Sequence, residues 1–311
     1  QVAAGVMQHA RRWLGPHSGI TGHGLLVAGG AAGIAAAFNA PLAGVVFAIE
    51  ELSRKLESRS SGLIITAIVL AGLMGVSAFG NRSYFGVIQV TRLGWDALLP
   101  GLMVVFTCGV LGGLFAKLMA ASLTGSPERM NRLRARFPVR FAAGGGLAIA
   151  VIGLVTGGAT FGAGSEAVKH MLEGHADVPS FYVTLKFIAT WLAAWCGVPG
   201  GIFAPSLSIG AGVGHNVSLL AGADIAPALI AMGMAAFLAA VTQAPLTAFI
   251  IVMEMVDGHA MVLSLMASAM LASLVSRMLA RPLYETLALY MVAGVTATPA
   301  ATPPPSPPPA A

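Results

Sequence analysis

Charged side chains are scarce in this sequence. Asp, Glu, Lys and Arg together make up 9% of its 311 residues, whereas 57% of the residues are hydrophobic, and the mean hydropathy is +0.83. So few polar groups cannot coat a water-soluble globule of this size. The composition excludes an ordinary soluble domain and places the chain in a lipid bilayer.

Cysteine is equally rare, with Cys108 and Cys196 as its two positions. Both lie in apolar surroundings without the spacing of a metal site, so we interpret them as small buried side chains. The seven histidines are scattered and form no ligand pattern. These residues predict neither a metal, nor a cofactor, nor covalent chemistry.

Long basic or acidic runs are also lacking, although the net charge is +5. The basic residues fall into short clusters between apolar segments, and such clusters are typical of the cytoplasmic loops of membrane proteins. We therefore expect them on the cytoplasmic side, and we expect no nucleic-acid partner. The clusters are Arg54, Lys55 and Arg59; Arg129, Arg132, Arg134, Arg136 and Arg140; and Arg277 and Arg281.

The alternating polar and apolar pattern of a transmembrane β-barrel does not occur, and Ala, Leu, Met and Gly fill the apolar segments. The sequence thus predicts an all-α, polytopic membrane protein with one transmembrane domain over residues 1–294. Two long spans are expected, Gly62–Phe79 and Ala97–Leu123. Residues 295–311 are Pro-rich and are predicted to form an extended, disordered tail.

Other apolar segments are too short to cross a bilayer, which needs about 20 residues. Pro, Gly or a carboxylate interrupts each of them. Irregular backbone at membrane depth must be buried in protein or line a cavity, as it does in transporter binding sites. These segments are Gly24–Phe38, Pro41–Glu51, Phe203–Leu220 and Pro245–Val256.

An internal repeat appears when the chain is shifted by 204 positions. Leu25–Glu51 then aligns with Leu229–Met255 without a gap. Two Ala-rich helices can match through composition alone, but here both segments share an Ala-Pro-Leu tripeptide and a carboxylate, Glu50 or Glu254, nine residues after the proline. The repeat predicts two related halves with a substrate site near their interface.

The segment Cys196–Gly214 combines glycines and Pro199 with the start of a new helix. Pro205 is placed in the first helical turn, where a missing N–H is tolerated. The amides of Ile202 and Phe203 would then be free, with Gly200 and Gly201 leaving room for close approach. A helix N-terminus with unpaired donors in a low dielectric suits a small anion. A Gly/Pro hinge between two packed helices is the alternative.

Four motifs, in the same order along the chain, resemble those of the CLC chloride channel and transporter family. GGIFAP at Gly200–Pro205 resembles the anion-site motif, and the segment Ala35–Leu52 resembles the one that precedes the inner proton-pathway glutamate. QAPLTAFIIVMEM at Gln243–Met255 resembles its second-half counterpart, and RPLYETL at Arg281–Leu287 resembles the final helix with its anion-coordinating tyrosine.

This resemblance implies a homodimer of inverted-repeat subunits, each with its own anion pathway, in a plasma membrane of bacterial type. It assigns the anion site to Gly201, Ile202, Phe203, Pro205 and Tyr284, with chloride as the substrate and no cofactor. Glu51 matches the glutamate that feeds protons to the pathway in exchangers. Chloride/proton exchange is thus expected; a passive gated chloride channel and a non-transporting structural membrane subunit are the alternatives.

Two motifs of the family do not occur here, a serine-containing G-S-G-I-P motif and the G-R-E-G-P motif with the outer gating glutamate. The segment Gln1–Gly15 resembles the helix that begins with the second motif. The repeat agrees, since Pro205 shifted back by 204 lands on position 1. We therefore expect the outer glutamate a few residues before Gln1, and we expect this chain alone not to transport.

Four ionisable residues in apolar segments remain to be explained, because a charge at the bilayer centre costs about 2.5–3.5 kcal/mol on insertion scales. For Glu51, pairing with Arg54 or Lys55 is an alternative to a proton pathway. Glu50 and Glu254 are expected to cap helices or bind loop amides. Lys186 is expected either to pair with a carboxylate or to snorkel.

Overall fold

The computed structural model describes residues 1–13, 21–53, 58–80, 83–88, 94–125, 128–174, 178–197 and 200–296, and every regular element in these ranges is helical. The predicted all-α class is confirmed. The helices are α1 (Val2–Ala10), α2 (Gly22–Phe38), α3 (Pro41–Phe47), α4 (Ser58–Phe79), α5 (Leu98–Thr124), α6 (Glu128–Arg136), α7 (Pro138–Val155), α8 (Ser165–Leu172), α9 (Tyr182–Trp195), α10 (Phe203–Ala221), α11 (Ala226–Thr242), α12 (Pro245–Met255), α13 (Val262–Leu279) and α14 (Leu283–Thr296). Residues 297–311, most of the predicted tail, lie outside the described residues.

Among the described residues, four helices are long and apolar enough to cross a membrane: Trp95–Thr124, Pro138–Val155, Ala223–Thr242 and His259–Leu279. The first contains the predicted span Ala97–Leu123. The other predicted span, Gly62–Phe79, lies within α4, but its apolar part, Gly62–Ala78, is shorter than these four helices. The segment of α11 is 78% buried and that of α7 only 6%. The apolar outer surface of α7 suits lipid, whereas α11 is the central helix of the bundle.

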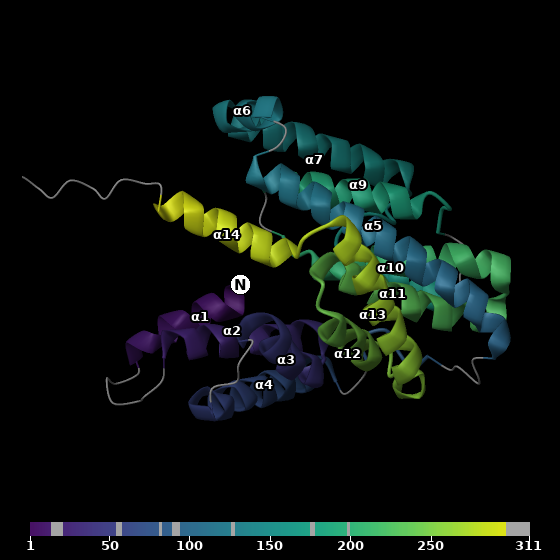
Figure 1. The fold of residues 1–311 in the computed structure, drawn as a ribbon, viewed down its shortest axis with the longest axis horizontal. Helices are drawn as coiled ribbons and strands as arrows, with labels where there is room; N and C mark the ends of the chain where they lie inside the picture. Colours follow the sequence, from purple (N-terminus) through teal and green to yellow (C-terminus); the bar gives the residue numbers. More distant parts are fainter. Residues whose placement is uncertain are drawn as a thin grey trace, which may run out of the picture.

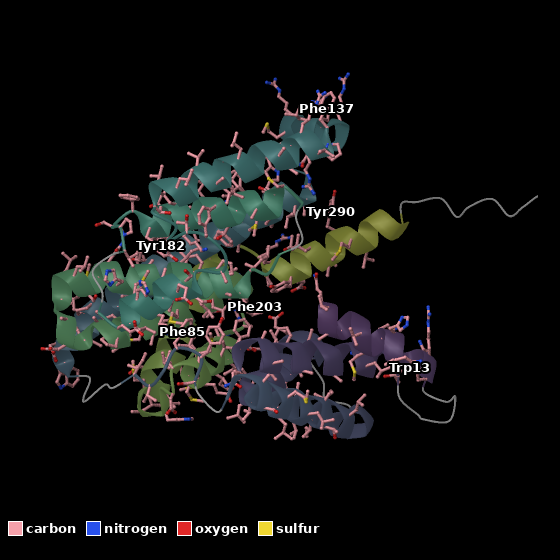
Figure 2. The ribbon with its side chains drawn as sticks, turned by 180° about the vertical axis from the view of Figure 1, so that it is seen from behind. Trp13, Phe85, Phe137, Tyr182, Phe203 and Tyr290 are labelled. Atoms are coloured by element: carbon pink, nitrogen blue, oxygen red, sulfur yellow. The ribbon has the colours of Figure 1, made fainter. Side chains whose placement is uncertain are left out.

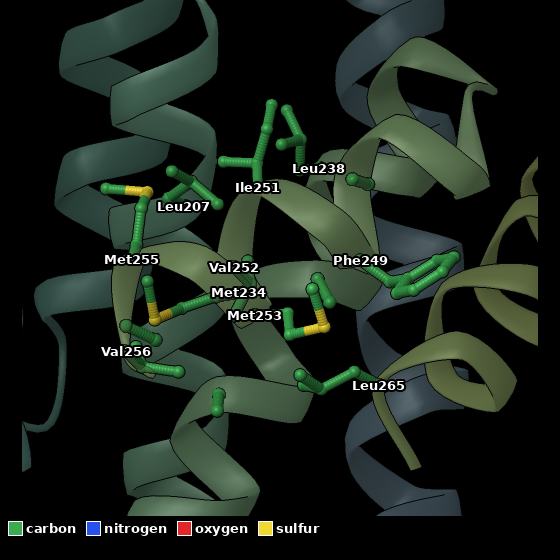
Figure 3. Close-up of a cluster of buried hydrophobic side chains, with 14 of the residues drawn as sticks. Leu207, Met234, Leu238, Phe249, Ile251, Val252, Met253, Met255, Val256 and Leu265 are labelled. Atoms are coloured by element: carbon green, nitrogen blue, oxygen red, sulfur yellow. The ribbon is translucent and has the colours of Figure 1, made fainter. Parts of the chain in front are cut away.

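Figure 1 shows α1–α4 grouped together beside a larger body that holds α5–α13, with α14 extending away from both. Helix α11 packs on α5, α10, α12 and α13, and α3 is the element of the smaller group that packs on α12. The core around α12, drawn in Figure 3, contains Leu238, Phe249, Val252 and Met255. The two groups therefore meet along α3 and α12.

The internal repeat is visible in the backbone. Helices α2 and α11 are followed by Asn39 and Gln243, which both adopt left-handed conformations with φ of 49° and 60°. A helix with proline in its first turn follows in each case, α3 from Pro41 and α12 from Pro245. The predicted breaks in the two segments are confirmed, and their equivalence extends to backbone conformation.

Candidate functional site

Helix α10 begins at Phe203 without a side-chain cap. Its first internal hydrogen bond is donated by the Ser206 amide to the Ile202 carbonyl at 3.0 Å, so earlier amides have no partner within the helix. Gly201 precedes them, is exposed, and has no atom within 4 Å of the place where a Cβ would stand. The helix end thus offers N–H donors and space to a small ligand, with the positive end of the helix dipole behind them.

Aromatic side chains from four helices meet at this helix end. The ring of Tyr284 on α14 stacks on Phe203, with centroids 6.2 Å apart and an interplanar angle of 20°. Phe47 on α3 and Phe38 on α2 contact the same ring, at centroid distances of 5.9 and 6.3 Å. Figure 2 shows Phe203 near the middle of the molecule, close to the start of α14. The N-terminal end of α10 therefore lies where both halves of the chain meet.

Glu51 lies in the π-helical continuation of α3, Ala48–Ser53, and is half-buried. Its carboxylate interacts electrostatically with Tyr284. A carboxylate, a phenol and a helix N-terminus thus form one neighbourhood, although their positions in the sequence are far apart. The alternative partners of Glu51, Arg54 and Lys55, lie outside the described residues.

Glu50 and Glu254 bind backbone amides, as the sequence predicts, and each reaches across to the other half. The Glu50 carboxylate accepts hydrogen bonds from the amides of Leu246 and Thr247 at 3.1 and 2.6 Å. The Glu254 carboxylate accepts from Leu42 and Ala43 at 3.1 and 2.8 Å. Glu50 lies just after α3 and Glu254 lies in the last turn of α12, and each caps the start of the other helix. Helices α3 and α12 therefore run antiparallel, as inverted repeats require.

Comparison with known protein families identifies the family of the chain. The family model described as voltage gated chloride channel matches residues 1–277. The chain belongs to the voltage-gated chloride channel (CLC) family. Proteins of this family are anion channels and transporters rather than enzymes, and this CLC chain is accordingly an integral membrane protein.

Three solved CLC structures share the fold of this chain. A slow cyanobacterial Cl⁻/H⁺ antiporter is 25% identical, with a TM-score of 0.75 over 94% of this chain and 70% of its own. A CLC-type fluoride/proton antiporter is 21% identical, with a TM-score of 0.75 over 92% of this chain and 70% of its own. A eukaryotic CLC transporter is 26% identical, with a TM-score of 0.61 over 86% of this chain and 46% of its own. The predicted CLC-type architecture is confirmed.

Lys186 of this CLC chain requires a correction. Its side chain is only 1% exposed, and Nζ donates to the carbonyls of Thr160 and Gly162 at 2.9 and 2.8 Å. The sequence predicts either a carboxylate partner or an ammonium group that snorkels to the membrane surface, and the structure shows neither among the described residues. The loop between α7 and α8 turns through several glycines and leaves carbonyls without helical partners, and the buried ammonium group satisfies two of them.

Phe38 and Phe47 are site residues that the sequence motifs did not reveal. Under the 204-residue shift they correspond to Thr242 and Ile251. The first half therefore carries a ring at two positions where the second half carries none. This departure from the repeat is the signal that could have found them, because both rings contact Phe203 and the equivalent positions in the second half have no ring.

Proposed function

We propose that this CLC chain takes part in chloride/proton exchange, with chloride bound at the start of α10 and protons delivered through Glu51. The observation that supports the proposal best is the position of Tyr284, whose ring stacks on Phe203 at the start of α10 and which lies within the electrostatic influence of Glu51. This arrangement supports a role for an ionisable carboxylate near the proposed anion site. The cyanobacterial relative with 25% identity is a Cl⁻/H⁺ antiporter.

The proposed anion site uses helix geometry in place of a cationic side chain. The amides of Ile202 and Phe203 donate to the ion, Gly201 allows it to approach the backbone, and Pro205 starts the helix without needing an N–H partner. The Tyr284 hydroxyl supplies a further donor. Because these groups carry only partial charges, the ion is held by hydrogen bonds that can be exchanged during transport.

In the proposed mechanism Glu51 carries the proton. A charged carboxylate at membrane depth is costly, and it repels a nearby anion. The protonation of Glu51 is therefore coupled to the binding of chloride. The protonated form of Glu51 favours chloride beside Tyr284, and the ionised form disfavours it. We extend the proposal to a homodimer in a bacterial plasma membrane, in line with the family resemblance.

The test of proton coupling is Glu51→Gln in the full-length protein reconstituted in liposomes. The amide cannot exchange a proton, so we expect chloride-driven proton uptake to stop while chloride flux continues. Glu166→Gln, which changes an exposed carboxylate on α8, is the matched control and should leave both fluxes unchanged. Proton uptake that persists in Glu51→Gln would contradict the proposal, and chloride flux without proton uptake in the unmodified protein would identify a passive channel.

The anion site is tested separately by chloride binding. Tyr284→Phe keeps the ring on Phe203 and removes only the hydroxyl. A hydrogen bond to a charged group contributes about 1.5–3 kcal/mol, so chloride affinity measured by calorimetry should fall about tenfold or more. Tyr290→Phe, exposed on the same helix, is the control. Equal affinities for the two variants would remove Tyr284 from the site, and an unmodified protein that binds no chloride would favour a structural subunit.

A further inference from the structure

The turn between α11 and α12 is bound to the end of α13 by side-chain hydrogen bonds in both directions. Gln243 is 9% exposed, and its Nε2 donates to the Ala280 carbonyl at 2.9 Å. In the opposite direction, Nη2 of Arg277 donates to the Gln243 carbonyl at 3.5 Å, and Oγ of Ser276 donates to the Ala240 carbonyl. A buried amide side chain that reaches a loop carbonyl fixes the position of that loop.

The loop that Gln243 holds leads directly to the proposed anion site. Helix α13 ends at Leu279 and α14 begins at Leu283, so residues 280–282 form the whole connection. Ala280 is extended, with φ of −143° and ψ of 154°. Tyr284 is the second residue of α14. Because the connection has only three residues, we expect a shift of Ala280 to be passed on to Tyr284.

The other side of the same turn is held by the first half of the chain. The Glu50 carboxylate binds the amides of Leu246 and Thr247, three and four residues after Gln243. Glu50 is next to Glu51 in the sequence. Hydrogen bonds therefore connect Glu50 to the start of α12 and connect Gln243, in the turn before it, to Ala280, which lies four residues before Tyr284.

We propose that Gln243 is a positioning residue, which sets the place of the Tyr284 hydroxyl at the anion site through the Ala280 carbonyl. This inference rests on the proposed chloride site. In this role Gln243 acts through the backbone: its side chain ties the loop before α14 to the turn that precedes α12, whose start Glu50 caps. Loss of its amide releases the loop and moves the tyrosine hydroxyl away from the ion.

The experiment is a double-mutant cycle on chloride affinity, measured by calorimetry on the full-length protein. Gln243→Met has a similar length and no branch at Cβ, so it removes the donor with little change in bulk. We expect about a tenfold loss of affinity with Tyr284 present and less than a twofold loss in the Tyr284→Phe background, because the hydroxyl that Gln243 positions is then gone. Ser122→Ala is the control, since it removes the 2.9 Å hydrogen bond that Trp191 donates to Ser122, a bond that involves neither Gln243 nor Ala280, and it should not change affinity.

Equal losses in the two backgrounds, or no loss in either, would overturn the role of Gln243. A second measurement does not depend on chloride. Phe203→Cys and Tyr284→Cys, in a background with Cys108→Ala and Cys196→Ala, replace two stacked rings, and their rate of disulfide formation reports how α14 sits on α10. Adding Gln243→Met should slow this reaction severalfold. An unchanged rate sinks the inference, whereas absent chloride binding with a slowed rate refutes only the proposed anion site.

Discussion

At the scale of single residues, Gly233 and Gly210 set how closely α10 and α11 approach. A Cβ at Gly233 would stand 2.2 Å from the Gly210 carbonyl oxygen, and a Cβ at Gly210 would stand 2.2 Å from the Gly233 carbonyl oxygen. Both obstacles are backbone atoms, so no side-chain rotation can relieve the clash. Lipid provides no hydrophobic driving force between helices, and close backbone contact through small residues replaces it.

This contact predicts a large effect from the smallest possible substitution. Gly233→Ala should force the two helices apart and lower the free energy of unfolding by more than about 1 kcal/mol, as overpacked cores do. Gly144→Ala is the matched control, because no atom lies within 4 Å of its added methyl group, and alanine is the better helix former. Thermal unfolding in detergent should show a lower midpoint for the first variant only; equal midpoints would mean that the backbones can separate without cost.

At the scale of elements, the crossed caps of α3 and α12 predict equivalent effects at positions distant in sequence. Glu50→Gln and Glu254→Gln each remove the charge that faces a helix N-terminus, so each should cost about 1 kcal/mol of stability. Glu128→Gln, an exposed carboxylate in the first turn of α6, should cost no more than a few tenths. Denaturant unfolding followed by circular dichroism measures all three, and a cost at only one of the two caps would contradict the paired arrangement.

Helix boundaries at Pro41, Pro245 and Phe203 were predictable because proline and glycine act locally, through φ and the missing N–H. The repeat likewise predicted which residues are equivalent. It could not predict that Glu50 would bind the amides near Thr247, because that pairing depends on the antiparallel packing of two helices about two hundred residues apart. The carbonyl partners of Lys186 were hidden for the same reason, since backbone acceptors leave no trace in the sequence.

Some site residues could likewise be predicted from the sequence, and others could be found only from tertiary contacts. Ile202, Phe203 and Tyr284 could be proposed from short motifs, and the structure brings Phe203 and Tyr284 together. Gln243 could not be proposed in this way, because its left-handed backbone conformation already accounts for a polar residue before Ala-Pro-Leu. Only the tertiary contact with Ala280 shows that its side chain reaches toward the final helix.

At the scale of the whole molecule, the two ends of the bundle differ in charge. Helices α5 and α11 run in the same direction, because Gly101 lies against Met232 and Gly112 lies against Ala240. The start of α11 therefore lies at the end of the bundle where α5 begins, and α6, with its arginines, follows the other end of α5. Figure 1 shows α6 and the free end of α14 on the same side of the molecule.

This polarity predicts the orientation of the protein in its membrane. By the positive-inside rule the arginine-rich end faces the cytoplasm. In a background with Cys108→Ala and Cys196→Ala, Ala135→Cys on α6 and Ala223→Cys before α11 place single thiols at exposed positions at opposite ends. A membrane-impermeant maleimide should label position 223 in right-side-out vesicles and position 135 only in inverted vesicles. Labelling of both positions from one side would disprove the predicted crossing, and the reverse pattern would show that packing overrides the arginine cluster.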